Sequence, residues 1–266
     1  MTAPVPILMY HSIAHEPTLD TRQLSVRPGA FAEQLELLGE RGFTPITTAD
    51  LAAVWRAPGR SLPRKPVLIT FDDGYEGVHR HALPALAEHG FASTLFVSTG
   101  WLRGAHDTGG GLDLMLDWDQ VRQLASVGTE IGGHSHTHPQ LDQLDDEDLW
   151  FELLRCREIL TDELGIRPAS FAYPYGYSSR RVRRTVRGAG FAQSLAVGNG
   201  LARRAQGPFA LQRVTVRRST GIEEFERLVE GRSIARNFAR DRAHTKGYAV
   251  VRRARQARRK ATRTRV

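Results

Sequence analysis

Short runs of apolar residues alternate along this chain with longer segments whose apolar positions recur every three or four residues. The runs predict buried strands, and the longer segments predict amphipathic helices. The predicted strands are residues 5–10, 43–46, 67–71, 92–98, 129–133, 169–173, 192–197 and 211–216. The predicted helices are residues 28–41, 49–56, 77–89, 118–127, 145–164, 178–189 and 221–231. Such alternation is typical of a parallel α/β fold, and we expect a barrel with its helices outside.

Two adjacent carboxylates, Asp72 and Asp73, stand where the strand predicted over 67–71 runs out. Side chains alternate along a strand, so the two neighbours leave its tip in different directions. One carboxylate can then hold a metal ion while the other faces a water molecule. Gly74 allows a sharp exit from the strand, but Asp-Gly is also common turn chemistry. On these residues alone, a turn and a functional site are equally open interpretations.

Three histidines, His134, His136 and His138, follow the predicted strand 129–133. On an extended strand the outer two would lie about 13 Å apart, too far to share one metal ion. In a turn or helical segment, residues four apart converge on one side, and His136 would then point elsewhere. A metal site and an exposed polar loop both remain open.

Two further polar elements stand at strand ends. Residues 171–176, Phe-Ala-Tyr-Pro-Tyr-Gly, end one predicted strand, and His11 ends the first. Each is ordinary by itself, as an aromatic turn or as a lone structural histidine. All four elements, however, fall at the carboxyl ends of predicted strands, the face on which α/β barrels assemble their active sites. This agreement favours one site over four unrelated turns.

The charge of the chain is unevenly distributed. The formal net charge is +8, but residues 232–266 hold 13 Lys and Arg against one acid, Asp241, a local charge of +12. The remaining 24 basic and 28 acidic residues give residues 1–231 a net charge of −4. We therefore expect a mildly acidic folded domain over residues 1–231 and a basic, flexible tail over residues 232–266.

The composition also bears on location. No run of 18 uncharged apolar residues occurs, so no membrane-spanning helix is expected. The N-terminus lacks the basic start and the small-residue cleavage site of a signal peptide. A single cysteine, Cys156, excludes an internal disulfide. A reducing, cytoplasmic setting is the simplest expectation.

The arginine-dense tail has three open interpretations. Each Lys or Arg near an anionic bilayer can contribute about 1 kcal/mol, so the tail could hold the protein at the inner membrane face. It could also bind nucleic acid without sequence preference, or extend into solvent without a partner. No nucleic-acid-binding motif is present, so we expect no specific nucleic-acid partner.

The strand-end motifs resemble those of the polysaccharide deacetylases of the NodB-homology type, carbohydrate esterase family 4. Residues 70–74 match the family motif T-F-D-D-G, and residues 134–138 match H-S/T-x-x-H. Residues 171–176 occupy the place of the third motif. The resemblance covers residues 5–230, nearly everything but the tail. It implies an irregular (β/α) barrel with about seven strands.

The resemblance also implies a role for each polar residue. Asp73, His134 and His138 would bind a divalent metal ion, with zinc expected; three protein ligands plus water is the open arrangement of hydrolytic sites. Asp72 would be the general base that takes a proton as water attacks the acetamide carbon. The backbone N–H of Tyr175 would help the metal stabilise the oxyanion.

Two positions depart from the family pattern. The arginine that often stands two residues before the third-motif proline, where it tethers the catalytic aspartate, is replaced by Ala172. We expect Arg213, in the strand 211–216, to take its place, because a guanidinium matches a carboxylate bidentately. The late Leu-x-His motif, whose histidine protonates the leaving amine, is also missing. The only histidine after residue 190 is His244, in the tail.

A branch resembling the poly-N-acetylglucosamine deacetylases supplies this acid differently. Members of that branch also read F-A-Y-P-Y-G, and they carry an N-terminal L-x-Y-H motif. Residues 8–11, Leu-Met-Tyr-His, have this pattern. The resemblance therefore assigns the acid to His11, with a buried histidine bonded to the backbone as the alternative.

The leading hypothesis is a metal-dependent hydrolase that removes an N-acetyl group from an amino sugar in a polysaccharide, an oligosaccharide or a lipid-linked glycan. A deformylase, or another hydrolase of C–N amide bonds, would use the same motifs. A carbohydrate-binding or membrane-binding protein on an inactive barrel belongs to a different class. The two departures leave it open, whereas the intact aspartate pair and histidines argue against it.

Overall fold

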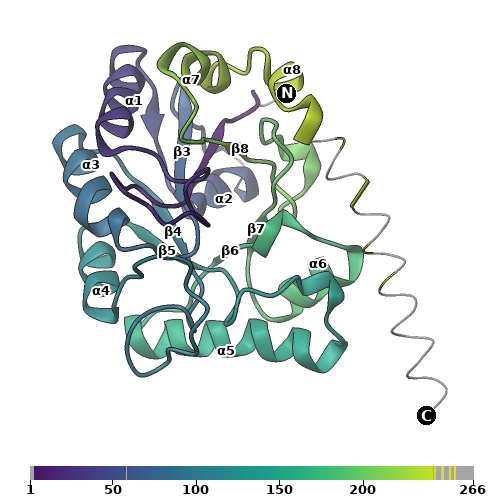
Figure 1. The fold of residues 1–266 in the computed structure, drawn as a ribbon. Coiled ribbons are helices and arrows are strands. Elements are labelled where there is room, and N and C mark those ends of the chain that lie inside the picture. Colours follow the sequence, from purple (N-terminus) through teal and green to yellow (C-terminus); the bar gives the residue numbers. More distant parts are fainter. Residues whose placement is uncertain are drawn as a thin grey trace.

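A computed structural model describes residues 3–57 and 59–241, together with residues 243, 247, 248, 252 and 255. The strands form one parallel sheet in the order β7-β6-β5-β4-β3-β1-β8, and β2 pairs with β3 beside this path. The seven strands of the path curl into an irregular half-barrel, which confirms the predicted fold (Figure 1). A parallel bridge between Leu195 and Leu211 links β7 to the segment that leads into β8. The strands are β1 (Ile7–Tyr10), β2 (Thr44–Pro45), β3 (Pro66–Phe71), β4 (Thr94–Val97), β5 (Glu130–Gly133), β6 (Ser170–Ala172), β7 (Gln193–Leu195) and β8 (Val214–Thr215).

Helices surround the strands, close to where the sequence predicts them (Figure 1). They are α1 (Pro28–Glu40), α2 (Thr48–Arg56), α3 (Leu83–His89), α4 (Trp118–Ser126), α5 (Asp146–Leu164), α6 (Arg180–Gly188), α7 (Ile222–Val229) and α8 (Ile234–Asn237). The helix predicted over 77–89 is divided, because a π-helical turn, Val78–Ala82, precedes α3. Pro84 has no N–H to give to the carbonyl four residues earlier, and the hydrogen-bond register shifts at this point.

Every second residue of β3 faces the interior of the barrel. Leu68 lies there in one cluster with Phe96, and Asp72 has the same parity at the carboxyl end of the strand. The hydrogen bonding between β3 and β1 continues to this point, since the Asp72 N–H donates to the carbonyl of Tyr10 at 3.0 Å. The alternate residues pack outward against the helices: Val67, Ile69 and Phe71. Strand register therefore aims Asp72 into the barrel and sends Asp73 a different way.

Among the helices that the structure describes, α5 is the longest, and it packs beside β5 and braces the loop that follows it. The Asp145 side chain accepts a hydrogen bond from the Asp148 N–H and caps its first turn. Gly165 ends the helix with a φ of 68°, a conformation that favours glycine. The inward face of α5 is buried: Leu149, Glu152, Leu153, Cys156, Ile159 and Leu160.

Packing continues beyond residue 231, where the sequence predicts the folded domain to end. Ile234 and Phe238 are buried in one cluster with Val214 of β8. In the sequence these two apolar residues lie between arginines, and in the structure they extend the packed part of the chain into the predicted tail. Most of residues 242–266, including His244, lies outside the described residues, so the flexible tail stays a prediction. Within the described residues, no helix is both long and apolar enough to cross a membrane.

Candidate active site

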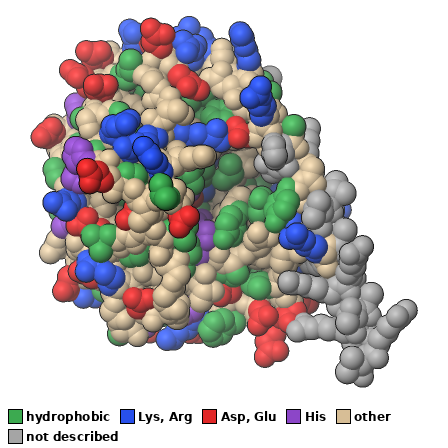
Figure 2. Space-filling view, viewed as in Figure 1, with side chains coloured by type: hydrophobic (Ala, Val, Ile, Leu, Met, Phe, Trp, Pro, Cys, Tyr) green, Lys and Arg blue, Asp and Glu red, His purple; other side chains and the backbone are tan. Residues whose placement is uncertain are grey.

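The carboxyl ends of the strands open into a cavity of about 780 Å³. The space-filling view shows the surface hollowed near the middle of its visible face, with hydrophobic side chains along one edge (Figure 2). Six of the seven predicted site residues line this cavity: His11, Asp72, Asp73, His134, His138 and Tyr175. The seventh, Arg213, is fully buried and makes contact with Asp72.

Arg213 binds Asp72 through both of its terminal nitrogens. The Nη1–Oδ1 and Nη2–Oδ2 distances are both 2.6 Å, the bidentate geometry of a guanidinium with a carboxylate. The Arg213 guanidinium also lies 5.7 Å from the centre of the Phe96 ring, inside the barrel. Burial raises the pKa of Asp72, but the charge and hydrogen bonds of Arg213, together with His134, hold it below its ordinary value. Asp72 is therefore a fixed, ionised carboxylate at neutral pH.

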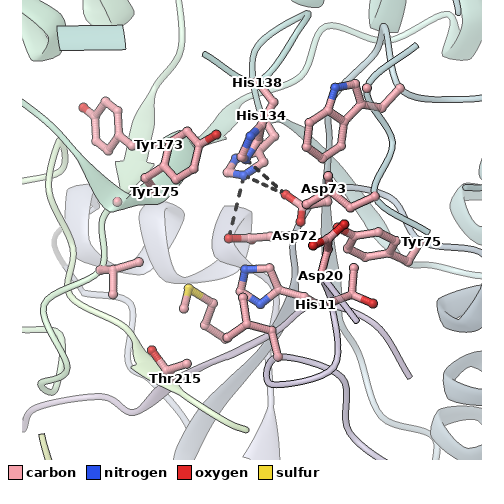
Figure 3. Close-up of a pocket in the computed structure, with 18 of the residues that line it drawn as sticks. His11, Asp20, Asp72, Asp73, Tyr75, His134, His138, Tyr173, Tyr175 and Thr215 are labelled. Carbon is pink, nitrogen blue, oxygen red and sulfur yellow. Dashed lines mark ion pairs between the residues drawn. The ribbon is translucent and has the colours of Figure 1, made fainter. Parts of the chain in front are cut away.

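Asp73 faces two imidazoles instead of a guanidinium. Its Oδ1 lies 3.2 Å from His134 Nε2 and 3.3 Å from His138 Nε2. In Figure 3 the two rings lie above Asp72 and converge on Asp73. Burial raises the pKa of Asp73, whereas the two histidines outweigh it and bring this pKa well below its ordinary value.

A hydrogen bond at Nδ1 fixes the tautomer of the neutral His134 imidazole. His134 Nδ1 lies 2.8 Å from the carbonyl of Ala172, and a carbonyl can only accept a hydrogen bond. Nδ1 therefore carries a hydrogen, and Nε2 is the nitrogen that remains available to a metal ion. Burial lowers the pKa of His134, but the Asp72 and Asp73 carboxylates outweigh it and raise this pKa, which favours a proton on Nε2 when no metal ion is bound. The residue that replaces the family arginine thus contributes its backbone oxygen, a common partner for a metal-binding histidine.

The residues fit a small divalent cation. His134 Nε2 and Asp73 Oδ1 lie 3.2 Å apart, and a positive charge between them, either a proton or a metal cation, stabilises this approach. Among the described residues, the buried Oδ1 has no hydrogen-bond partner. The ligand atoms of Asp73, His134 and His138 all lie within 4.8 Å of one another. Tetrahedral ligands about 2.0–2.1 Å from zinc would be about 3.3 Å apart, close to the two oxygen–nitrogen distances seen here. Two imidazole nitrogens and one carboxylate are a donor set that suits zinc.

The third histidine of the cluster points elsewhere, as the spacing predicts. His136 Nδ1 lies 2.9 Å from the Thr99 hydroxyl, and its ring packs against Phe151. Ser135 steadies the loop, because its hydroxyl accepts a hydrogen bond from the His138 N–H at 3.0 Å. The loop is bent, with positive φ values of 68° at Ser135 and 60° at His138.

His11 lines the cavity on the other side of Asp72 from the two imidazoles (Figure 3). Its Nδ1 is buried and has no hydrogen-bond partner among the described residues. Burial lowers the pKa of His11, and the nearby Asp73 and Asp72 carboxylates raise it only in part, so the pKa stays below its ordinary value. The imidazole is therefore neutral in the free protein at pH 7.

Tyr175 sits at a strained turn beside His138. Its φ of 59° is unusual for a tyrosine, and such strain is found most often at functional sites. Its half-exposed ring packs 4.8 Å from the ring of His138, between centres. The ring of Trp101 also packs against His138, with the ring centres 4.5 Å apart.

Several cavity residues lie outside the predicted set. Tyr75 directly follows the T-F-D-D-G motif, and burial followed by the Asp73 charge raises its pKa, so its hydroxyl stays protonated. Its position next to a strand-end motif is a signal that could have identified it. Trp101 and Asp20 line the cavity from loops without periodicity, where the sequence carries no comparable signal. Asp241 comes from the predicted tail and pairs with Arg217 at 2.8 Å.

Several known proteins have sequences similar to this one. The family model of the polysaccharide deacetylases matches residues 59–194, about half of the chain. YxkH of Bacillus subtilis (strain 168), whose name places it among the polysaccharide deacetylases, is 27% identical over 214 residues. That match covers 80% of this chain and 72% of YxkH. Poly-beta-1,6-N-acetyl-D-glucosamine N-deacetylase of Escherichia coli (strain K12) is 24% identical over 253 residues, which cover 82% of this chain but 37% of the relative.

Solved structures share the fold. The Streptococcus pyogenes deacetylase PplD, in complex with acetate, matches with a TM-score of 0.77 and 22% identity, over 86% of this chain and 99% of that one. IcaB from Ammonifex degensii matches with a TM-score of 0.71 and 23% identity, over 85% and 96% of the two chains. With the fold shared and the family motifs gathered around one cavity, the chain belongs to the polysaccharide deacetylase family.

Proposed function

We propose that this chain is a metal-dependent hydrolase that removes the N-acetyl group from an amino sugar. One observation carries the proposal: two adjacent carboxylates on the wall of one cavity have different partners. Asp72 is held by Arg213, and Asp73 faces two imidazoles. The names of the Bacillus and Escherichia relatives support a carbohydrate substrate with N-acetylated residues.

Asp73, His134 and His138 would hold the metal ion, with zinc as the expected ion. When bound in such a site, a divalent ion lowers the pKa of water and polarises the carbonyl of the substrate. The chain contributes the fixed direction of the His134 lone pair, set by the Ala172 carbonyl.

Asp72 would be the general base of the reaction. Its lowered pKa keeps it in the ionised form that can accept a proton from the attacking water. A carboxylate offers about four lone-pair sites, and Arg213 occupies two of them, so acceptor capacity remains. Arg213 would therefore position the base without blocking it.

His11 would be the acid that protonates the leaving amine, and the Tyr175 N–H would bind the developing oxyanion. Because His11 is neutral in the free protein, it must first gain the proton that it donates to the amine, and the attacking water, deprotonated by Asp72, would be the source of that proton. The Asp73 and Asp72 carboxylates favour the charged imidazole and would support its protonation. Preorganised N–H donors such as that of Tyr175 stabilise an oxyanion without reorganisation.

Acetate release, assayed with and without a chelator, tests the proposal. The substrates are a panel of N-acetylated oligosaccharides, nucleotide sugars and lipid-linked sugars, with an N-formylated sugar as the comparison. We expect chelator-sensitive acetate release from at least one glycan. Preferential formate release would identify a deformylase on the same scaffold. Carbohydrate binding without release of either acid would indicate an inactive binding protein.

The basic tail would bring the enzyme to an anionic membrane surface, with no specific nucleic acid as a partner. Residues 242–266 contain ten Lys and Arg and no acid, which supports this part of the proposal. A cytoplasmic protein bound peripherally at the inner face would then meet lipid-linked glycans there.

A further inference from the structure

The loop between the two histidine ligands has a backbone that needs external support. Within five residues it turns His134 and His138 toward the same carboxylate, with positive φ values at Ser135 and His138. Residues with side chains rarely adopt such values, and they persist only where the surroundings hold them. The residues that hold this loop therefore affect the position of both ligands.

Glu152, in the middle of α5, makes three hydrogen bonds to the centre of this loop. Its Oε2 accepts from the N–H groups of His136 and Thr137, both at 2.8 Å. Its Oε1 accepts from the Thr137 hydroxyl at 2.5 Å. One buried carboxylate thus binds two consecutive residues that stand between the ligands.

The carboxylate of Glu152 is unusual in being buried without a cation. Glu152 is 5% exposed, and among the described residues no Lys or Arg forms an ion pair with it. A buried charge is costly unless hydrogen bonds or an opposite charge compensate it. Here the three donors of the loop provide that compensation, so helix and loop stabilise each other.

We propose that Glu152 is a positioning residue that sets the metal affinity of the site by fixing the backbone of residues 134–138. It would act through the loop, because its three hydrogen bonds end on His136 and Thr137 and not on the ligand atoms. Groups outside the ligand shell that orient metal ligands commonly change affinity by about 10–100-fold when they are removed. This inference rests on the metal site of the proposed function.

Zinc affinity, measured by competition with a chromophoric chelator on metal-free protein, tests the role without any assay of activity. Glu152→Ala removes all three acceptors, and we expect it to weaken zinc binding by about 10-fold or more. Glu152→Gln keeps an acceptor oxygen for the two N–H groups and places an amide beside the Thr137 hydroxyl, so it should restore most of the affinity. Glu158→Ala, at an exposed position of the same helix, is the matched control and should bind zinc like the wild type.

The melting temperature of the metal-free variants separates positioning from general stability. If Glu152→Ala melts earlier but its folded form binds zinc as tightly as the wild type, Glu152 is only structural and the inference is wrong. Should Glu152→Ala not fold, Thr137→Val provides the test, because it removes only the hydroxyl contact. A small loss of affinity in that variant would support positioning, and wild-type affinity would contradict it. A wild-type protein that binds no zinc would refute the proposed function itself, before any variant is compared.

Discussion

Asp72 and Asp73 are neighbours in the chain, but their surroundings separate what each can do. Both oxygens of Asp72 are bound by Arg213, and a carboxylate held in this way is oriented but still able to accept a proton. Asp73 faces the imidazole nitrogens of two histidines, an arrangement that favours a cation. At the scale of single residues, this difference is the basis for proposing a base and a ligand.

Arg213→Met should leave Asp72 buried without its cation and lower the free energy of unfolding by about 3–5 kcal/mol. The lowered pKa of Asp72 contributes stability above the pH at which the unfolded carboxyl titrates, and this is lost as pH falls through the folded pKa. Without Arg213 the effect of burial, which raises the pKa, remains. The acid limb of the kcat/KM profile should therefore move to higher pH.

Denaturant unfolding and a pH profile measure these two effects of Arg213→Met. Arg213→Lys keeps the charge but cannot form the bidentate contact. Its free energy of unfolding and the pH of its acid limb should therefore lie between those of Arg213→Met and the wild type. An acid limb that stays at its wild-type pH in Arg213→Met would contradict the positioning of Asp72 by Arg213.

His11→Ala should reduce kcat by about 10²–10⁴-fold, the usual contribution of general acid–base catalysis, while zinc stays bound. His11 is not among the three grouped ligands, which is why metal content should not change. Turnover and metal content of the same sample measure both quantities. Turnover near the wild-type value would assign the acid to another group.

At the scale of elements, hydrogen bonds connect two loops that line the cavity. The Asp113 carboxylate accepts hydrogen bonds from the Thr18 N–H at 3.1 Å and from the Thr21 hydroxyl at 3.0 Å. The loop around Thr21 and the loop around Asp113 both line the cavity. Their connection holds together two segments of the cavity wall.

Asp113→Ala should therefore raise KM for an N-acetylated oligosaccharide several-fold and leave kcat almost unchanged. The two lost hydrogen bonds support substrate binding, whereas Asp72 and the metal ligands do not depend on them. Steady-state kinetics on an oligosaccharide and on a small aryl acetate measure the effect, and the small substrate should be little affected. A fall in kcat on both substrates would show that the loop connection supports the chemistry itself.

The strand ends could be predicted from the sequence because their chemistry coincides with a periodic signal. An apolar run precedes Asp72 and a predicted strand precedes His134, so both motifs are placed at the carboxyl edge of the parallel sheet. Arg213 could be predicted because the missing family arginine left a charge to be compensated. Trp101 and Asp20 could not, since they lie in loops whose course depends on long-range hydrogen bonds. The burial of Phe238 was also missed, because one phenylalanine among arginines has no detectable period.

At the scale of the whole molecule, the chain after residue 231 belongs to the fold as well as to the predicted tail. Phe238 is buried, and Asp241 lines the cavity. Arg252 is also buried, with its guanidinium 3.2 Å from the centre of the Tyr177 ring and its Nε 3.0 Å from Asp142. A truncation that tests the tail should therefore keep Asp241, and a separate substitution of Arg252 must control for the loss of its buried contacts.

Deletion of residues 242–266 should abolish binding to vesicles that contain anionic lipids and leave turnover of a soluble oligosaccharide close to the wild-type value. It removes ten basic residues, each worth about 1 kcal/mol at an anionic surface. Vesicle cosedimentation measures the binding, with neutral vesicles as the lipid control. Arg252→Ala, which removes the buried contact but keeps the remaining charge, should still bind. Unchanged binding after the deletion would refute the membrane part of the proposal.

The most direct test of the central claim measures bound zinc and acetate release on the same samples of wild type, Asp72→Asn and Asp73→Ala. The wild type should bind one zinc ion and release acetate from an N-acetylglucosamine oligomer. Asp72→Asn should keep the zinc and lose about 10²–10⁴-fold in turnover, whereas Asp73→Ala should lose both. Stoichiometric zinc in Asp73→Ala, or wild-type turnover in Asp72→Asn, would contradict the division between ligand and base.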